Sequence, residues 1–373
     1  MKRAAYFDNL RIALTILVIF HHTAIAYGAS GGWCYITPET VQGGTKIALS
    51  SILAVDQAFF MSLFFFISAY MMPYSFDKKG FKVYIKDRFM RLGVPLLIYS
   101  VLIGPCLNYG IQVHLNSSPV NFPSFILKNV TKNPNTSHMW FVLALLIFES
   151  IYALYRKFPK LSISKLVPEN APTNWNIAIF IIVCGILAFL LRLVYPIGGK
   201  NIIGLQLGYF TLYIAMYILG IIARRKKWMD TLSYNNSIIW FVVAIIVIPL
   251  IVLAWIDLTH NPEYMVQYIG GFHLRSLFLS FWEAIVCVGI CYFSIMAFRK
   301  NLDISTKMSI NLAADSYAAY VIHPVVVVGV TILSEQLSLS PFIKFLIAIT
   351  IIVIVCFILA HNIRKIPGLK KIL

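Results

Sequence analysis

The sequence predicts an all-α protein, a polytopic bundle of about ten transmembrane helices with both termini in the cytoplasm. Hydrophobic residues make up 60% of the 373 residues and charged residues only 12%. Soluble domains use about 45 to 50% apolar and about 25% charged residues. Several stretches also exceed the roughly 18 apolar residues that mark a membrane span. We therefore expect residues 1–373 to form a single integral membrane domain.

Ten apolar segments follow one another along the chain, and none of the connections between them is long enough for a soluble domain. The expected spans are residues 9–29, 47–73, 92–113, 138–155, 176–195, 204–223, 238–257, 274–297, 313–333 and 341–361. The first of them carries Arg11, His21 and His22 and is too long for a cleaved signal peptide, so we interpret it as a permanent span.

The basic residues gather on alternate loops, which gives the topology. The clusters are Lys2, Arg3 and Arg11; Lys78, Lys79, Lys82, Lys86, Arg88 and Arg91; Arg156, Lys157, Lys160 and Lys165; Arg224, Arg225, Lys226 and Lys227; Arg299, Lys300 and Lys307; and Arg364, Lys365, Lys370 and Lys371. Basic loops are cytoplasmic. An even number of spans then places both termini in the cytoplasm of a multi-pass protein, expected in a bacterial inner or plasma membrane.

The same distribution explains the net charge of +17 without nucleic acid. No basic stripe interleaved with aromatic residues lies on a polar segment, so we expect membrane lipids and no nucleic acid as partners. The six cysteines show no paired metal-ligand spacing, and we expect no metal.

Ionisable side chains inside the spans are the first candidates for a functional site. Each costs about 2.5 to 3.5 kcal/mol on insertion scales, so its presence needs a reason. They are Asp56, Glu149, Glu283, His22 and His323. All except Glu149 lie about nine to eleven residues into their helices and could share one depth. Glu149 lies nearer the cytoplasmic end and receives no role.

Arg11 and His22 are predicted to lie on one face of the first helix. Eleven residues bring them to within about 20° of each other and separate them by about 16 Å along the axis. Alone, Arg11 could snorkel to the headgroups and His22 could be a bonded core histidine. Together with the other buried charges they indicate a site, whereas His21 points about 100° away and is expected to pack.

A neutral imidazole is a suitable proton acceptor for a hydroxyl group, and a carboxylate can orient it. We therefore expect His22 to act as a base. Asp56 and Glu283 are both at a suitable depth to assist, and the sequence does not decide which of them, if either, touches His22.

Arg88 and Arg91 end the second basic cluster and lie three residues apart, on one helix face. Two guanidinium groups in this position could grip a phosphate together, although positive-inside topology also explains them. Ser68 and Tyr70 end the second span on the same cytoplasmic side.

Five short motifs, in order along essentially the whole chain, resemble the acyltransferase-3 family of membrane O-acyltransferases. They are Tyr6-Phe7-Asp8-Asn9-Leu10-Arg11 with His22 in R-x10-H spacing; Phe65-Phe66-Ile67-Ser68-Ala69-Tyr70, with Ala69 where the family has Gly; Arg88 and Arg91; His138-Met139-Trp140-Phe141-Val142; and Ser316-Tyr317, Tyr320 and His323-Pro324.

The resemblance implies transfer of an acyl group from cytoplasmic acyl-CoA, as donor substrate, to an extracytoplasmic carbohydrate or glycan. His22 would be the base or acyl carrier and Arg11 a supporting residue; Arg88 and Arg91, beside Ser68 and Tyr70, would bind the donor. The chain is most similar to the branch that succinylates glucans (glucans biosynthesis protein C), so acetyl or succinyl is conceivable.

Two outer loops, residues 28–46 with Trp33 and Tyr35 and residues 115–137, could hold the sugar by stacking and hydrogen bonds. A proton-coupled transporter or flippase for an anionic or glycolipid substrate is the alternative, because a mid-membrane His and carboxylates also suit a proton relay. A scaffold would leave the buried charges unexplained.

Overall fold

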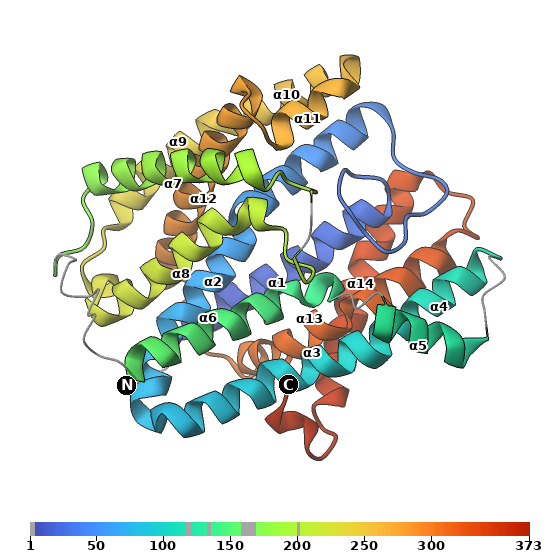
Figure 1. Ribbon diagram of the computed structural model, residues 1–373, viewed down its shortest axis with the longest axis horizontal. Helices are drawn as coiled ribbons and strands as arrows, with labels where there is room; N and C mark the ends of the chain where they lie inside the picture. Colours follow the sequence, from blue (N-terminus) through green and yellow to red (C-terminus); the bar gives the residue numbers. More distant parts are fainter. Residues whose placement is uncertain (1–3, 117–120, 133–135, 158–168, 200–201) are drawn as a thin grey trace.

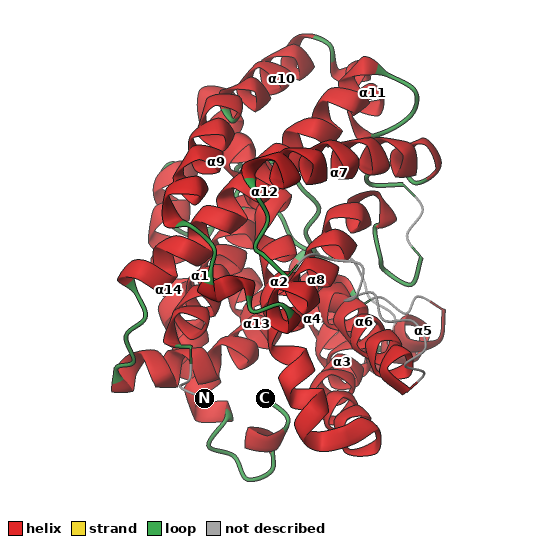
Figure 2. Ribbon diagram, turned by 90° about the vertical axis from the view of Figure 1, so that its left-hand side faces the viewer, coloured by secondary structure: helices red, strands yellow, loops and turns green. Residues whose placement is uncertain are grey.

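The computed structural model describes residues 4–116, 121–132, 136–157, 169–199 and 202–373, and every regular element within them is helical (Figures 1 and 2). The α-helices are α1 (Ala5–Ala26), α2 (Gly43–Arg88), α3 (Val94–Ile98), α4 (Gly104–His114), α5 (Phe122–Lys132), α6 (Trp140–Lys157), α7 (Asn174–Val194), α8 (Phe210–Arg225), α9 (Tyr234–Val247), α10 (Pro249–His260), α11 (Met265–Ile269), α12 (Leu274–Asn301), α13 (Lys307–Ser334) and α14 (Pro341–Ile363). The prediction of an all-α bundle is confirmed.

Nine helical stretches of the described chain are long and apolar enough to cross a membrane, and one of them accounts for two of the expected spans. This stretch, Gly43–His114, has 72 residues. At 1.5 Å per residue it would reach roughly 108 Å, against a hydrocarbon core of about 30 Å. Gly80, with φ of 70°, interrupts it within the expected cytoplasmic loop, so the chain can turn there.

The start of α1 lies beside the loop between α12 and α13. The backbone N–H of Tyr6 donates to Asp303 Oδ1 at 3.1 Å, and Asn9 Nδ2 donates to the Leu302 carbonyl at 2.7 Å. The charge pattern places that loop in the cytoplasm. The two termini also lie at one end of the bundle in Figure 2, as an even number of spans requires. Lys2, Arg3, Lys160 and Lys165 lie outside the described residues.

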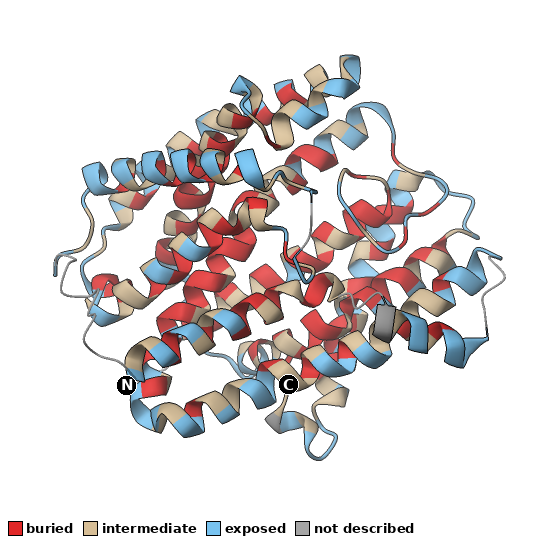
Figure 3. Ribbon diagram, viewed as in Figure 1, coloured by how far each residue is buried: buried red, intermediate tan, exposed pale blue. Residues whose placement is uncertain are grey.

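Helices α1, α2, α12 and α13 form the centre of the bundle. Helix α1 packs against the other three, and α2 also packs along α6, α8 and α12. The helices α7, α9, α10 and α14 carry exposed apolar residues, mostly Ile and Leu. Figure 3 shows that buried residues gather toward the middle of the bundle and exposed ones along its outer helices. Apolar residues turned outward are what a lipid environment favours.

Two local features differ from the sequence expectation. The connection 115–137 contains the helix α5, whose Phe122 and Phe125 rings pack on Tyr109 of α4; at eleven residues it is too short to span. The expected span 238–257 is divided into α9 and α10 at Pro249, because proline cannot donate the backbone hydrogen bond that a continuous helix needs.

Candidate active site

A cavity of about 660 Å³ lies among the outer ends of α1, α2, α6, α8, α10 and α12. The loop after α1 also contributes to its wall. The polar side chains around it include His21, His22, Trp33, His138 and Glu283. Ligand sites in proteins have this size and this mixture of aromatic walls and few polar groups.

His22 and His323 meet at the edge of this cavity, although they are 301 residues apart. Nδ1 of His22 lies 2.9 Å from Nε2 of His323, and the two rings stack with centroids 4.9 Å apart. His323 is fully buried, whereas His22 lines the cavity. The two predicted histidines therefore form one hydrogen-bonded pair.

Pro324 explains which nitrogen of His323 carries the proton. In a helix, the N–H of residue 324 would bond to the carbonyl of Tyr320, but proline has no N–H. His323 Nδ1 lies 2.6 Å from that free carbonyl oxygen, which can only accept, so Nδ1 must donate. The neutral ring then presents Nε2 as an acceptor.

The proton positions of His22 follow from this arrangement. Since His323 Nε2 accepts, His22 Nδ1 must donate, and the lone pair of a neutral His22 lies on Nε2. No described residue forms a hydrogen bond to His22 Nε2, and His22 lines the cavity. The Tyr320 carbonyl thus fixes the tautomer of His323, and His323 in turn fixes the tautomer of His22, whose ring lines the cavity.

Aromatic rings hold this pair from the outer side. Trp33, from the loop after α1, stacks on His22 with centroids 4.1 Å apart and planes 19° from parallel. His138 packs edge-on against His323 at 4.8 Å, and the Tyr320 hydroxyl donates to the His138 carbonyl. Stacked rings of this kind restrict the rotation of His22.

Asp56 does not reach His22. Its Oδ2 lies 3.7 Å from Nδ1 of His21, and both side chains are buried. His21 packs, since its buried ring stacks on Phe60 with centroids 5.1 Å apart, and it also lines the cavity and faces the carboxylate of α2. The sequence placed Asp56 at the right depth, but depth does not determine which of two adjacent histidines it faces.

Glu283 is paired with an arginine that the sequence analysis did not consider. Arg192 of α7 donates through NH2 to Glu283 Oε2, through NH1 to Ser280 Oγ at 3.1 Å, and through Nε to the Gly208 carbonyl at 3.1 Å. Its side chain is 1% exposed. Glu283 therefore lines the cavity as half of a buried ion pair, with no contact to His22.

Arg11 lies well away from this site. Its guanidinium pairs with Asp8, one turn earlier in α1, and its side chain is 40% exposed. The eleven-residue spacing corresponds to about 16 Å along the helix, and Arg11 does not line the cavity.

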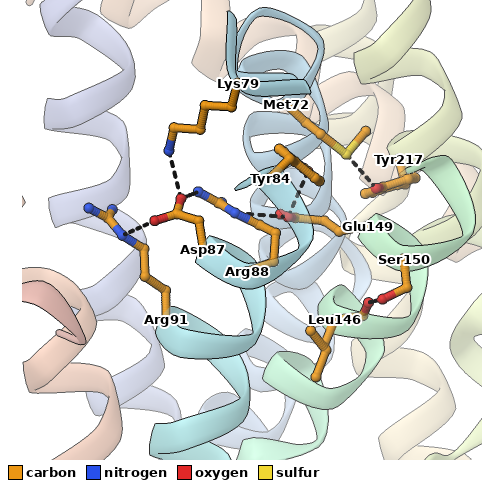
Figure 4. Close-up of polar contacts among 10 residues, drawn as sticks. All are labelled: Met72, Lys79, Tyr84, Asp87, Arg88, Arg91, Leu146, Glu149, Ser150 and Tyr217. Atoms are coloured by element: carbon orange, nitrogen blue, oxygen red, sulfur yellow. Dashed lines mark hydrogen bonds and ion pairs between the residues drawn. The ribbon is translucent and has the colours of Figure 1, made fainter. Parts of the chain in front are cut away.

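Arg88 and Arg91 converge on a single carboxylate (Figure 4). Arg88 NH2 donates to Asp87 Oδ2 at 2.8 Å, and Arg91 Nε lies 3.7 Å from Asp87 Oδ1. Arg88 Nε is also 3.4 Å from Glu149, which accepts a hydrogen bond from the Tyr84 hydroxyl at 2.8 Å. Arg88 is thus anchored inward on Glu149, while Arg91 is 56% exposed.

Ser68 and Tyr70 do not contact these arginines. Ser68 is half-buried, and the Tyr70 ring packs on Phe7 at 5.0 Å and lies under the Arg224 guanidinium at 5.2 Å. Tyr70 therefore belongs to the packing between α1, α2 and α8.

The loop after α1 contributes two further groups. Tyr35 is buried and donates to Glu335, and its pKa is raised by burial and by this carboxylate. It does not line the cavity and is not placed to stack on a sugar there. Cys34 does line the cavity, as an exposed residue, and desolvation within the cavity raises the pKa of its thiol to about 11.

No group of three or more His, Cys, Asp or Glu side chains in the described part of the chain could hold a metal ion. The model of the acyltransferase domain family matches residues 4–361. No curated protein and no solved structure matches the chain.

Proposed function

Because this chain belongs to the acyltransferase domain family, we propose that it moves a short acyl group from cytoplasmic acyl-CoA to a hydroxyl of an extracytoplasmic carbohydrate or glycan. The acyl group is of the acetyl or succinyl class, and the glucan-succinylating branch is the part of the family that the chain resembles. The proposed location is a bacterial inner or plasma membrane.

The observation that carries the proposal is the pair formed by His22 and His323. The Tyr320 carbonyl holds the proton of His323, His323 holds the proton of His22, and the free Nε2 belongs to a ring that lines the cavity. A base prepared in this way contributes about 10² to 10⁴ in rate.

The reaction then proceeds at one carbonyl carbon. The acceptor oxygen attacks the thioester carbon, its proton passes to His22 Nε2, and the carbonyl electron pair moves onto the carbonyl oxygen. When the C=O bond re-forms, the C–S bond breaks and His22 returns the proton to the departing thiolate. The products are an ester and free CoA thiol.

The two ends of the donor require different surroundings. Lys79, Arg88 and Arg91 gather around Asp87, on the segment that the charge pattern places in the cytoplasm, and can hold phosphates. The thioester end, which is uncharged, would extend into the bundle toward His22. Asp56 is proposed to support the site through His21, and Arg11 to support helix α1 through its ion pair with Asp8, away from the cavity.

The test is transfer of label from acetyl-CoA and succinyl-CoA to cell-envelope glycans, using membranes that carry the wild-type chain, His22→Ala, or Arg88→Ala with Arg91→Ala. His260→Ala is the matched control, since His260 is exposed on α10 outside the cavity. We expect label from the wild type and the control, and a loss of at least about 100-fold with His22→Ala.

Equal labelling by a stably inserted His22→Ala protein would remove His22 from the chemistry. If no CoA thioester labels any glycan, acyl transfer from CoA is excluded, and transport of an intact substrate becomes the function to test.

A further inference from the structure

The cavity beside His22 has no Lys or Arg among its described lining residues, so histidines are its only basic side chains. Its ionisable lining residues are His21, His22, Cys34, His138, Tyr209, Tyr213, Tyr268 and Glu283. Among the described residues in this wall there is no Lys or Arg, and Glu283 is the single carboxylate. A ligand in this cavity therefore meets no Lys or Arg charge, and the one carboxylate in the described wall, Glu283, is paired with Arg192.

Arg192 lies close to the cavity, but its guanidinium group is already hydrogen-bonded to other residues of the protein. All three of its nitrogen atoms are bonded, to Gly208, Ser280 and Glu283, and its side chain is 1% exposed. Glu283 uses only Oε2 for this pair; Oε1 forms no hydrogen bond to a described residue. The pair as a whole is neutral and turns a hydrogen-bond acceptor toward the cavity.

The acyl group must occupy this space during transfer, since its carbonyl carbon has to reach the acceptor beside His22. The free carboxylate of a succinyl group is only three carbon–carbon bonds of about 1.5 Å from that carbonyl. It would therefore be buried in the same cavity, without a cationic partner and with Glu283 in the wall. Burying an unpaired carboxylate is strongly unfavourable, and a second carboxylate increases the cost.

We propose that the cavity selects an uncharged short acyl group, of the acetyl class, and rejects succinyl, and that Glu283 with Arg192 enforces this choice. The inference rests on the proposed function and narrows its donor. Glu283 Oε1 is in addition an acceptor for a hydroxyl of the carbohydrate, a neutral group that needs no cation.

The test compares three donors with the wild-type protein: acetyl-CoA, succinyl-CoA and butyryl-CoA. Butyryl has the four-carbon chain of succinyl without the charge, so it separates charge from size. We expect transfer from acetyl-CoA and butyryl-CoA, and kcat/KM for succinyl-CoA at least about 100-fold below that for butyryl-CoA, because a buried charge would be left unpaired.

Two variants examine the cause. Glu283→Gln removes the carboxylate and leaves Arg192 as a cation beside the cavity, so the ratio of succinyl to butyryl transfer should rise at least about tenfold. Arg192→Met combined with Glu283→Gln removes both charges and should keep the ratio low. Both ratios are taken on protein shown to be folded by its elution as a single species in detergent.

Succinyl transfer at the rate of butyryl transfer by the wild type would overturn the inference and leave the proposed function standing. A failure of all three donors would overturn the proposed function and this inference with it. If Glu283→Gln does not fold, the comparison of succinyl and butyryl in the wild type still decides the selectivity.

Discussion

The hydrogen bond between His22 and His323 gives the most direct test of the site. His323→Phe keeps an aromatic ring between Trp33 and His138 but removes the nitrogen that accepts from His22 Nδ1. His323→Gln loses the ring but can still accept through its amide oxygen. We expect the Phe variant to lose activity and the Gln variant to retain part of it.

The magnitude follows from the charge that His22 acquires. In the transition state His22 takes up a proton, so its bond to His323 becomes a hydrogen bond from a charged donor, worth about 1.5 to 3 kcal/mol. At about 1.36 kcal/mol per factor of ten, His323→Phe should lower kcat by about 10- to 160-fold. The KM for the donor should change little, because the phosphates bind elsewhere.

The assay is initial-rate acyl transfer with purified protein in detergent or nanodiscs, with His260→Phe as the matched control for a histidine outside the cavity. His323→Phe also leaves the Tyr320 carbonyl without a donor, so the folded fraction of each variant must be measured. A kcat within twofold of wild type would refute the role of His323 in orienting His22.

Three other predictions concern separate parts of the chain. Pro324→Ala supplies a helix N–H that competes for the carbonyl bound by His323, so the melting temperature should rise while kcat falls about two- to tenfold. Arg88→Met should destabilise the protein by about 3 kcal/mol in denaturant unfolding, because Glu149 is left buried without its cation. Arg91→Met should stay within about 0.5 kcal/mol of wild type and raise the donor KM; equal stability losses would contradict this division. Alkylation of Cys34 should accelerate about 100-fold from pH 7 to pH 9 and continue to rise toward the pKa of about 11; a plateau near pH 8 would contradict the raised pKa of this exposed thiol.

The fold was predictable because two independent signals agree. Apolar length identifies spans, and alternating clusters of Lys and Arg count them, so a missed span would have put a cluster on the wrong side. The helix at Phe122–Lys132 escaped this reasoning, since it does not cross the membrane and neither signal applies to it. The structure adds one detail that neither signal gives: helix geometry continues almost unbroken through the expected cytoplasmic loop, with Gly80 as the break.

The sequence predicted how deep the candidate site residues lie in the membrane, but not which of their side chains contact one another. Counting residues into a helix gives the position along the membrane normal, and on this basis His22 and His323 were correctly grouped at one depth. The rotation of one helix relative to the next depends on packing over the whole bundle, which a single sequence does not reveal. Asp56 faces His21, one residue and about 100° from His22, the histidine for which the sequence offered Asp56 and Glu283 as candidate partners.

Arg192 could have been recognised from the sequence by a signal that was not used. The charge pattern places the end of its span outside the cytoplasm, where the positive-inside rule gives no reason for an arginine. Lys344 and Arg275 are basic residues on the same outer side, and the structure pairs Lys344 with Glu39 at 2.8 Å and Arg275 with Asp257 at 3.1 Å. A basic residue that topology does not explain needs a carboxylate, because a cation near the apolar core is costly without one. Applied to Arg192, this argument indicates that a carboxylate such as Glu283 is held as an ion pair and is therefore not free to serve as the partner of His22.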